Sequence, residues 1–324
     1  MIDLFIQKTL QATGADDLFL IEDIQQLWSG YGMISRYGLK NAQYDSVVIK
    51  NIRYPDEKHH PRGWSTDFSH QRKVTSYHVE MHWYDTFSSR CDAFCRIPRC
   101  LAMETEGEEV LLVLEDLNSA GFPIRKTSAN WQDIESCIKW LANFHATFIQ
   151  EKPDGLWETG TYWHLETRPD ELQVLSDQKL KKAASKIDQA LKDCKYQTFV
   201  HGDAKLANFC FGTDDKVAAV DFQYVGGGVG VKDLAYFIGS CLYEEDCERF
   251  EPKLLNRYFQ ELKAAVKRLG KPIDSDELEL EWRKLFPYAW ADFHRFLKGW
   301  SPGHWKINSY SERICSEVIA DCGL

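Results

Sequence analysis

The chain has 324 residues, of which 44% are hydrophobic and 27% charged, as expected of a globular protein long enough to bury a core. Its 39 basic and 49 acidic residues give a formal net charge of -10. That balance argues against a general nucleic-acid binder, which needs a basic surface to neutralise phosphates.

The cysteines and the N-terminus bear on the cellular compartment. Ten cysteines are dispersed without paired spacing, which favours free thiols in a reducing environment. The segment Met1-Ile2-Asp3-Leu4-Phe5-Ile6 lacks the basic region and sustained apolar run of a signal peptide, and no stretch is apolar enough to span a bilayer. We therefore expect a cytoplasmic protein that binds neither nucleic acid nor membrane. The sequence does not indicate an oligomeric state.

The first third of the chain is predicted to be rich in strands. A short helix from about Asp3 to Gln11 should end near Gly14, and a second helix should contain Glu80. A long polar loop is expected over 51–75. The apolar and β-branched runs predict strands at 33–39, 47–50, 95–102 and 110–114. The helix that contains Glu80 is predicted over 75–90.

Beyond Ser119 the pattern changes to helices. Apolar residues recur at helical spacing over 131–149, and a second helix is predicted over 171–194. From Lys232 onward the chain reads as helices separated at prolines 252, 272 and 287. We predict an α+β fold with a β-rich lobe over residues 1–117 and a larger, mainly helical lobe over 118–324.

Two short apolar runs, 198–200 and 217–220, flank the most informative string of the sequence, His201-Gly202-Asp203-Ala204-Lys205-Leu206-Ala207-Asn208. Gly202 permits a sharp bend, and a tight loop would present the Asp203 carboxylate while the Asn208 amide oxygen faces a metal ion. A hairpin would return Asp221 beside Asn208. Hard oxygen ligands of this kind suit Mg²⁺.

Phosphoryl transfer needs a group that orients the acceptor, metal ligands, a cation near the phosphates and a loop that covers them. Asp203, Asn208 and Asp221 supply the first two, and Lys205 could reach the transferring phosphoryl group as a point charge. The alternative is a pair of ordinary turns, because Gly, Asp and Asn favour turns. The complete string between two strands favours the chemical interpretation.

The string from His201 to Asn208 with Asp221-Phe222-Gln223 resembles the aminoglycoside phosphotransferase and choline kinase superfamily, whose fold is of the protein-kinase type. Three further segments are similar to its ecdysteroid-kinase-like branch: Leu114-Glu115-Asp116-Leu117, Leu141-Ala142-Asn143-Phe144-His145-Ala146 and Asp233-Leu234-Ala235-Tyr236-Phe237. The resemblance implies a two-lobed small-molecule kinase that uses ATP and Mg²⁺.

The same resemblance implies roles for individual residues. Asp203 would be the catalytic base, and Asn208 and Asp221 the Mg²⁺ ligands. Lys50, which ends the run Val-Val-Ile, would contact the ATP phosphates, with Glu80 as its partner on the next helix. For both, a solvated surface charge is the alternative. Backbone groups around Glu115 to Leu117 would meet adenine.

The expected glycine loop departs from the family pattern. Gly30-Tyr31-Gly32-Met33-Ile34-Ser35 has serine where the protein-kinase motif has its third glycine. Gly30 and Gly32 are candidates for the phosphate-covering loop, although two glycines also describe a plain turn. Ser35 could donate a hydrogen bond to a phosphate oxygen.

The acceptor is the part of the function that the sequence leaves open. We expect a small hydroxylated molecule, with aromatic residues of the C-terminal region and the polar groups of Asp292 and His294 as candidate contacts. An acidic, aromatic pocket would suit a cationic acceptor. A protein kinase and a nucleotide-binding pseudokinase are the alternative functions. No Ala-Pro-Glu string follows Asp221, and Gly202 stands where protein kinases usually have arginine, which disfavours the protein kinase.

Overall fold

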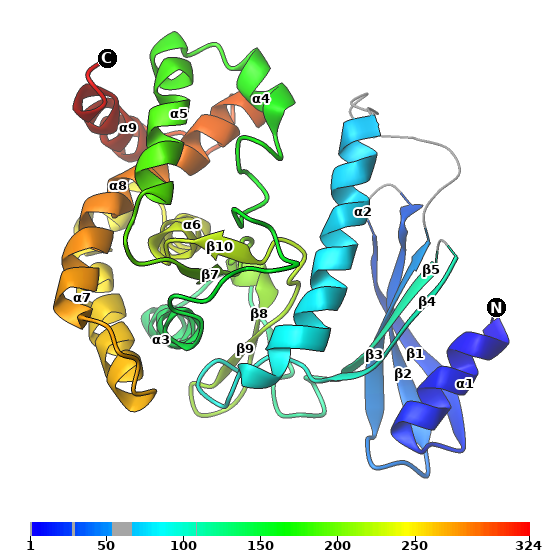
Figure 1. The fold of residues 1–324 in the computed structure, drawn as a ribbon. Helices are drawn as coiled ribbons and strands as arrows, with labels where there is room; N and C mark the ends of the chain where they lie inside the picture. Colours follow the sequence, from blue (N-terminus) through cyan, green and yellow to red (C-terminus); the bar gives the residue numbers. More distant parts are fainter. Residues whose placement is uncertain (1, 28–29, 54–66, 108) are drawn as a thin grey trace. The chain divides into compact units, whose positions relative to one another are not determined.

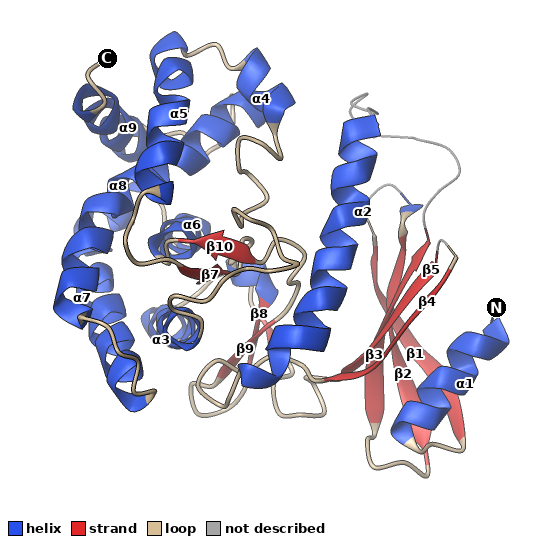
Figure 2. Cartoon of the chain, in the orientation of Figure 1, coloured by secondary structure: helices blue, strands red, loops and turns tan. Residues whose placement is uncertain are grey.

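The computed structural model describes residues 2–27, 30–53, 67–107 and 109–324 (Figures 1 and 2). Its α+β class agrees with the prediction. The helices are α1 (Ile2–Thr13), α2 (Asp67–His82), α3 (Trp131–Thr147), α4 (Pro169–Val174), α5 (Gln178–Lys192), α6 (Val231–Cys241), α7 (Glu244–Arg268), α8 (Ser275–Trp300) and α9 (Ser309–Asp321). The strands are β1 (Asp17–Gln26), β2 (Gly32–Lys40), β3 (Ser46–Arg53), β4 (Cys100–Glu106), β5 (Glu109–Glu115), β6 (Ile124–Arg125), β7 (Thr198–Val200), β8 (Phe209–Phe211), β9 (Val217–Ala219) and β10 (Gly226–Gly228).

The chain forms two compact units. The first comprises residues 1–89, 97–124 and 210–220, and the second comprises 90–96, 125–209 and 221–324. The predicted lobe boundary after Leu117 falls inside a segment of the first unit, and residues 210–220 join that unit from the C-terminal half of the chain. No helix among the described residues is both long and apolar enough to cross a membrane.

The first unit is built on an antiparallel sheet with strand order β1-β2-β3-β5-β4. Because successive side chains of a strand point to opposite faces, Ile49 and Lys50 of β3 face opposite sides. Ile49 belongs to a buried cluster with Phe5 of α1 packed against it, whereas Lys50 pairs with Glu80 of α2. Helices α1 and α2 therefore serve different faces of the sheet, as Figure 1 shows.

The second unit is mainly helical (Figure 2). Helix α3 packs on α7, and α8 packs on α5, α6 and α9. Two short strands, β7 and β10, pair antiparallel inside this unit. The loop at Asp203 follows β7, and α6, which carries Asp233, follows β10. A capping box at Asn130 starts α3, because the Asn130 side chain accepts from the Asp133 N–H and the Asp133 carboxylate accepts from the Asn130 N–H.

Several element boundaries differ from the prediction. Residues 67–75 are helical, so the predicted polar loop is shorter, and its members 54–66 lie outside the described residues. The predicted helix over 171–194 is two helices, because the Asp177 carboxylate accepts the N–H of Leu180 and starts α5 afresh. Pro252 and Pro287 lie inside α7 and α8, where packing outweighs the local cost of a proline. The predicted strand at 95–102 begins only at Cys100.

The end of β5 is held by a buried carboxylate. Asp116 is 2% exposed and its Oδ2 accepts from Arg36 Nε at 2.8 Å and from Ser46 Oγ at 2.6 Å. Its Oδ1 accepts the N–H of Asn118 at 3.0 Å. One side chain thus ties β2, β3 and the segment after β5 together.

We predict that Asp116→Ala lowers the free energy of unfolding by about 1 to 3 kcal/mol, because the Ser46 hydroxyl and the Asn118 N–H lose their buried acceptor. Arg36 keeps its second carboxylate partner, Glu22, which limits the loss. Urea denaturation followed by circular dichroism measures the change. The exposed Asp45→Ala is the matched control and should stay within about 0.5 kcal/mol of wild type. Equal effects of the two substitutions would contradict the assignment.

Candidate active site

The loop that follows β7 carries the residues singled out by the sequence. Gly202 has a φ of +81°, and a Cβ there would lie 2.0 Å from the carbonyl oxygen of Tyr224. Only glycine fits this bend without moving the neighbouring backbone. The bend turns Asp203 away from the strand, and a 3-10 turn at Leu206–Asn208 brings Asn208 back toward it.

Asp203 is 8% exposed and both of its carboxylate oxygens have partners. Oδ1 accepts the hydroxyl of Tyr236 at 3.0 Å. Oδ2 accepts from Lys205 Nζ at 2.7 Å and from Asn208 Nδ2 at 3.1 Å. The Asp203 N–H lies 3.2 Å from Nδ1 of His201, so His201 braces the loop as expected. The structure therefore brings Asp203, Lys205 and Asn208 into one hydrogen-bonded group.

Lys205 connects this group to Asp221. Burial by itself would lower the pKa of Lys205, but the carboxylate of Asp203 and then that of Asp221 outweigh it, so the pKa is raised. The ammonium is thus kept charged between two acidic residues. Asp221 itself has a φ of +72°, uncommon for a residue with a side chain, and its Oδ1 accepts from Gln223 Nε2 at 2.6 Å.

The donor set fits a hard divalent cation. The Asn208 amide nitrogen donates to the Asp203 carbonyl oxygen at 2.8 Å and to its carboxylate, which turns the amide oxygen away from Asp203. That oxygen and the Asp221 carboxylate are the ligand types that Mg²⁺ prefers, and Mg²⁺ commonly takes only one or two protein ligands beside substrate phosphates.

A residue whose role the sequence did not indicate anchors the whole loop. Asp233 of α6 is fully buried, and its carboxylate accepts the backbone N–H groups of His201 at 2.5 Å and Gly202 at 3.0 Å. His145 of α3 contributes Nε2 at 3.1 Å, and its Nδ1 lies 2.7 Å from the Tyr258 hydroxyl. Both Asp233 and His145 belong to segments that resemble the family, and that resemblance was the only sequence feature that could have indicated their role.

Tyr236 was also missed as a contact of Asp203. It lies three residues after Asp233, so both side chains project from the same side of α6. Burial, and then the negative charge of Asp203, raise the pKa of Tyr236 well above its usual value, so the hydroxyl remains a donor. Tyr162 forms a hydrogen bond with Tyr236, and burial raises its pKa as well. Two neutral phenols therefore border the carboxylate.

In the first unit, Lys50 and Glu80 form the predicted pair. Lys50 Nζ lies 2.5 Å from Glu80 Oε2, and the two side chains are 4% and 2% exposed. A buried pair of this kind is not a solvated surface charge, which was the alternative. The ring of Tyr77 lies under the Lys50 ammonium at 5.4 Å.

The segment after β5 presents one backbone donor. The Glu115 N–H donates to the Arg99 carbonyl at 2.9 Å, and the Leu117 carbonyl accepts from Phe122 at 2.7 Å. Leu117 is 3% exposed, and its own N–H has no partner among the residues that the structure describes. A buried backbone donor without a partner is costly unless a ligand accepts from it.

Gly30 lies between β1 and β2 and Gly32 is the first residue of β2, with φ angles of +77° and +128°. Between them, the Tyr31 hydroxyl lies 2.5 Å from Nδ1 of His70 on α2, which ties the turn to that helix. Both glycines therefore have backbone angles that a residue with a side chain rarely adopts.

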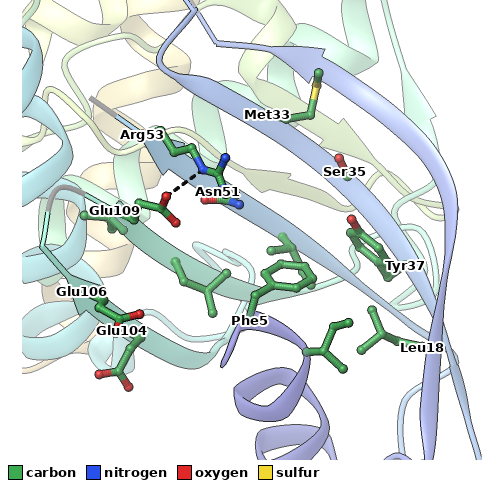
Figure 3. Close-up of a pocket in the computed structure, with 14 residues that line it drawn as sticks. Phe5, Leu18, Met33, Ser35, Tyr37, Asn51, Arg53, Glu104, Glu106 and Glu109 are labelled. Carbon is green, nitrogen blue, oxygen red and sulfur yellow. Dashed lines mark ion pairs between the residues drawn. The ribbon is translucent and has the colours of Figure 1, made fainter. Parts of the chain in front are cut away.

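Ser35 is not brought together with Lys50. It pairs with Ile49 in the sheet, one residue out of step with Lys50, so the side chains of Ser35 and Lys50 face opposite sides. Its hydroxyl donates to Asp23 at 2.6 Å, and it lines a cavity of about 380 Å³ with Phe5, Tyr37 and Asn51 (Figure 3). This placement does not favour Ser35 as a phosphate contact.

Asp292 and His294, expected beside the acceptor, are each 1% exposed. Asp292 accepts from Trp163 Nε1 at 3.1 Å and pairs with Lys232 at 3.1 Å and Arg295 at 2.9 Å. Although burial alone would raise the pKa of Asp292, these two cations hold it below its usual value. Burial lowers the pKa of His294 to about 4. Both side chains lie in the interior of the helical unit, which does not favour them as contacts of an acceptor.

We predict that Asp233→Asn lowers the free energy of unfolding by about 3 kcal/mol or more, because an amide cannot accept from two N–H groups and from His145 as well as a carboxylate does. Chemical denaturation measures it, with the exposed Asp321→Asn as control. A loss no larger than that of the control would mean that Asp233 does not hold the loop.

Solved structures of known enzymes share this fold at low sequence identity. Amicoumacin kinase hAmiN in complex with AMP-PNP, Ca²⁺ and Ami aligns with a TM-score of 0.58 and 16% identity, over 94% of this chain and 88% of that one. Macrolide 2'-phosphotransferase MphH from Brachybacterium faecium aligns with a TM-score of 0.52 and 14% identity, over 98% of this chain and 96% of that one. Choline kinase LicA from Streptococcus pneumoniae aligns with a TM-score of 0.50 and 10% identity, over 100% of this chain and 99% of that one.

These likenesses establish the two-lobed kinase-like fold that the sequence motifs predicted. No curated protein matches the chain significantly. The model of the ecdysteroid kinase-like family matches residues 36–154 and 158–271, which include Lys50, Glu80, Asp203, Asn208 and Asp221. The chain is therefore a member of the ecdysteroid kinase-like family.

Proposed function

We propose that this protein is a small-molecule kinase that transfers the γ-phosphoryl group of ATP to a hydroxyl of a small acceptor, with Mg²⁺ as the metal. The observation that carries the proposal is the group formed by Asp203, Lys205 and Asn208, with Asp221 acting on the same ammonium. Such a group combines a proton acceptor, a cation and hard oxygen ligands, which are the components that phosphoryl transfer needs.

In the proposed reaction the acceptor hydroxyl gives its proton to the Asp203 carboxylate while its oxygen forms a bond to the γ-phosphorus, and ADP leaves with the bridging oxygen. Lys205 stabilises charge on the transferring group. Asn208 and Asp221 would hold Mg²⁺, which supplies neutralisation of the phosphate charges when bound. Tyr236 keeps the Asp203 carboxylate oriented, since it donates to Oδ1 at 3.0 Å.

The first unit supplies the proposed nucleotide contacts. Lys50, held by Glu80, would bind the ATP phosphates, and Gly30 and Gly32 would let the backbone of the turn approach them. The Leu117 N–H and the backbone of Glu115 would meet the adenine edge. The kinase hAmiN, which shares the fold, was solved with the ATP analogue AMP-PNP and a divalent cation, Ca²⁺, which supports a nucleotide and a divalent metal here.

The cytoplasm is the compartment that we propose. All ten cysteines are free thiols in the structure. Burial raises the pKa of several of them, including Cys194 and Cys247, each to about 12, so these thiols stay protonated and unreactive.

Mg²⁺-ATP should stabilise the wild-type protein against heat, by about 2.7 kcal/mol when the nucleotide is present at 100 times its dissociation constant. Lys50→Met should lose most of this gain, because it removes the cation proposed to bind the phosphates. Differential scanning fluorimetry with and without EDTA measures both effects. Lys40→Met, which removes an exposed lysine of β2, is the matched control and should keep the gain. A gain that persists in Lys50→Met would remove this lysine from the nucleotide site.

The acceptor and the base can be tested in one assay. ATP consumption is measured across hydroxylated metabolites, and a product heavier by one phosphoryl group identifies the acceptor. Asp203→Asn should then lower kcat by about 10² to 10⁴, because it removes the proton acceptor, while Mg²⁺-ATP binding is retained. Asp214→Asn, an exposed change in another loop, should leave kcat unaltered.

Two outcomes separate the alternatives. A wild-type kcat in Asp203→Asn would rule out this residue as the base. Nucleotide binding without Mg²⁺ dependence, together with no turnover of any acceptor, would favour the pseudokinase. Labelling of proteins rather than metabolites by radioactive ATP would favour the protein kinase.

A further inference from the structure

The second unit contains a buried aromatic cluster close to Asp203. It consists of Trp163, Tyr236, Phe293, Phe296 and Leu297, with Tyr162, Trp300 and Ile307 packed against it. Its rings contact one another at centroid distances such as 4.8 Å for Trp163 and Tyr236 and 4.9 Å for Tyr236 and Phe293. An aromatic surface beside a carboxylate is the environment in which a cationic acceptor was expected.

A cation of the chain itself already occupies that position. Lys306, in the loop between α8 and α9, is half-buried, and its ammonium lies 5.4 Å from the ring centroid of Tyr236 and 5.7 Å from that of Phe293. The ring of Trp305 is 5.6 Å away. In the part of the chain that the structure describes, no carboxylate lies within 4.0 Å of this ammonium. Its contacts are aromatic faces, which attract cations but do not neutralise them.

Tyr236 links this ammonium to the proposed base. Its ring faces Lys306, and its hydroxyl donates to Asp203 Oδ1 at 3.0 Å. Asp203 forms no direct ion pair with this ammonium, since its two oxygens accept from Tyr236, Lys205 and Asn208, and its charge acts on Lys306 only at longer range. The lysine is therefore separated from the carboxylate by one phenol ring, and no carboxylate of the described residues is in direct contact with it.

The loop that carries Lys306 is held by the start of α9. The Ser311 hydroxyl donates to the carbonyl of Lys306 at 3.0 Å, and the Asn308 side chain accepts the N–H of Ser311 at 3.1 Å. The N–H of Lys306 lies 3.2 Å from Nδ1 of His304. Both backbone polar groups of Lys306 are thus hydrogen-bonded, so the start of α9 fixes the backbone from which the side chain projects.

The charge of this lysine depends on its surroundings. Burial lowers the pKa of Lys306 to about 8, while Asp203 acts to raise it and Lys205 to lower it. The ammonium remains mostly protonated at neutral pH, since its pKa is still above 7. A half-buried cation that no described carboxylate contacts directly gains from an anionic ligand and repels a cationic one.

We propose that Lys306 is a specificity-determining residue of the acceptor site, where its ammonium binds a carboxylate or other anionic group on a hydroxylated acceptor and excludes cationic acceptors. This inference rests on the proposed function in placing the acceptor beside Asp203. It reverses the expectation of a cationic acceptor, because the Lys306 ammonium already lies at the aromatic surface that would bind such an acceptor.

Three probes that share a benzene ring and a hydroxymethyl group test the charge preference: 4-(hydroxymethyl)benzoate, 4-(hydroxymethyl)benzamide and 4-(aminomethyl)benzyl alcohol. Their dissociation constants are measured by NMR titration of the full chain with Mg²⁺-AMP-PNP present. Wild type should bind the benzoate at least about tenfold more tightly than the amine. Lys306→Met should weaken the benzoate by about tenfold and change the neutral amide by less than about twofold, and Lys306→Arg should retain the preference.

Lys267→Met, which removes an exposed lysine of α7, is the matched control and should leave all three constants unchanged. The melting temperature of each variant verifies folding. Equal binding of the three probes, an unaltered benzoate constant in Lys306→Met, or no benzoate binding at the highest soluble concentration would each overturn the inference.

The kinase proposal fails in a different way. Benzoate binding that depends on Lys306, with no stabilisation by Mg²⁺-ATP and no phosphorylated product from any acceptor, would leave the anion site standing and reject the kinase. Conversely, phosphorylation of a neutral or cationic acceptor that requires Asp203 and is indifferent to Lys306→Met would support the kinase and reject the anion site.

Discussion

The carboxylate of Asp233 is the constraint on which the candidate site depends. Fully buried, it accepts two successive backbone N–H groups, from His201 and Gly202, and contacts His145. Hydrogen bonds to an ionised group are stronger than neutral ones, and a low local dielectric strengthens them further. The hydrogen bonds to this carboxylate fix the backbone at the Gly202 bend, and that bend sets the direction of the Asp203 side chain.

The electrostatics around Asp203 contrast with the chain as a whole. The formal net charge is -10, yet one lysine and two neutral phenols border this one carboxylate and a second lysine lies near it. Lys205 pairs with it directly, whereas Lys306 is separated from it by the ring of Tyr236. Positive charge gathered at a site of this kind favours anionic groups, and both the transferring phosphoryl group and the acceptor proposed here are of that type.

Local patterns revealed the chemistry well and the packing less well. Asp203, Lys205 and Asn208 lie within six residues, so a single loop can bring them together once its bend is held. The pairing of Lys50 with Glu80 was predictable from a strand followed by a helix. The side of the sheet on which Ser35 lies depends on the register between β2 and β3, because a shift of one residue exchanges the faces. The break between α4 and α5 depended on Asp177, which caps the start of the new helix.

By itself the sequence determined the α+β class, the motif for phosphoryl transfer and the family, because these reside in short strings and in hydrophobic periodicity. Only the tertiary structure decided which distant residues meet: Asp233 and His145 behind the loop, Tyr236 on Asp203, and Lys306 over the aromatic cluster. Lys306 lies 103 positions after Asp203, and nothing in its own segment, Ser301 to Asn308, differs from an ordinary loop. Contacts of that range arise from the packing of helices, which local spacing does not encode.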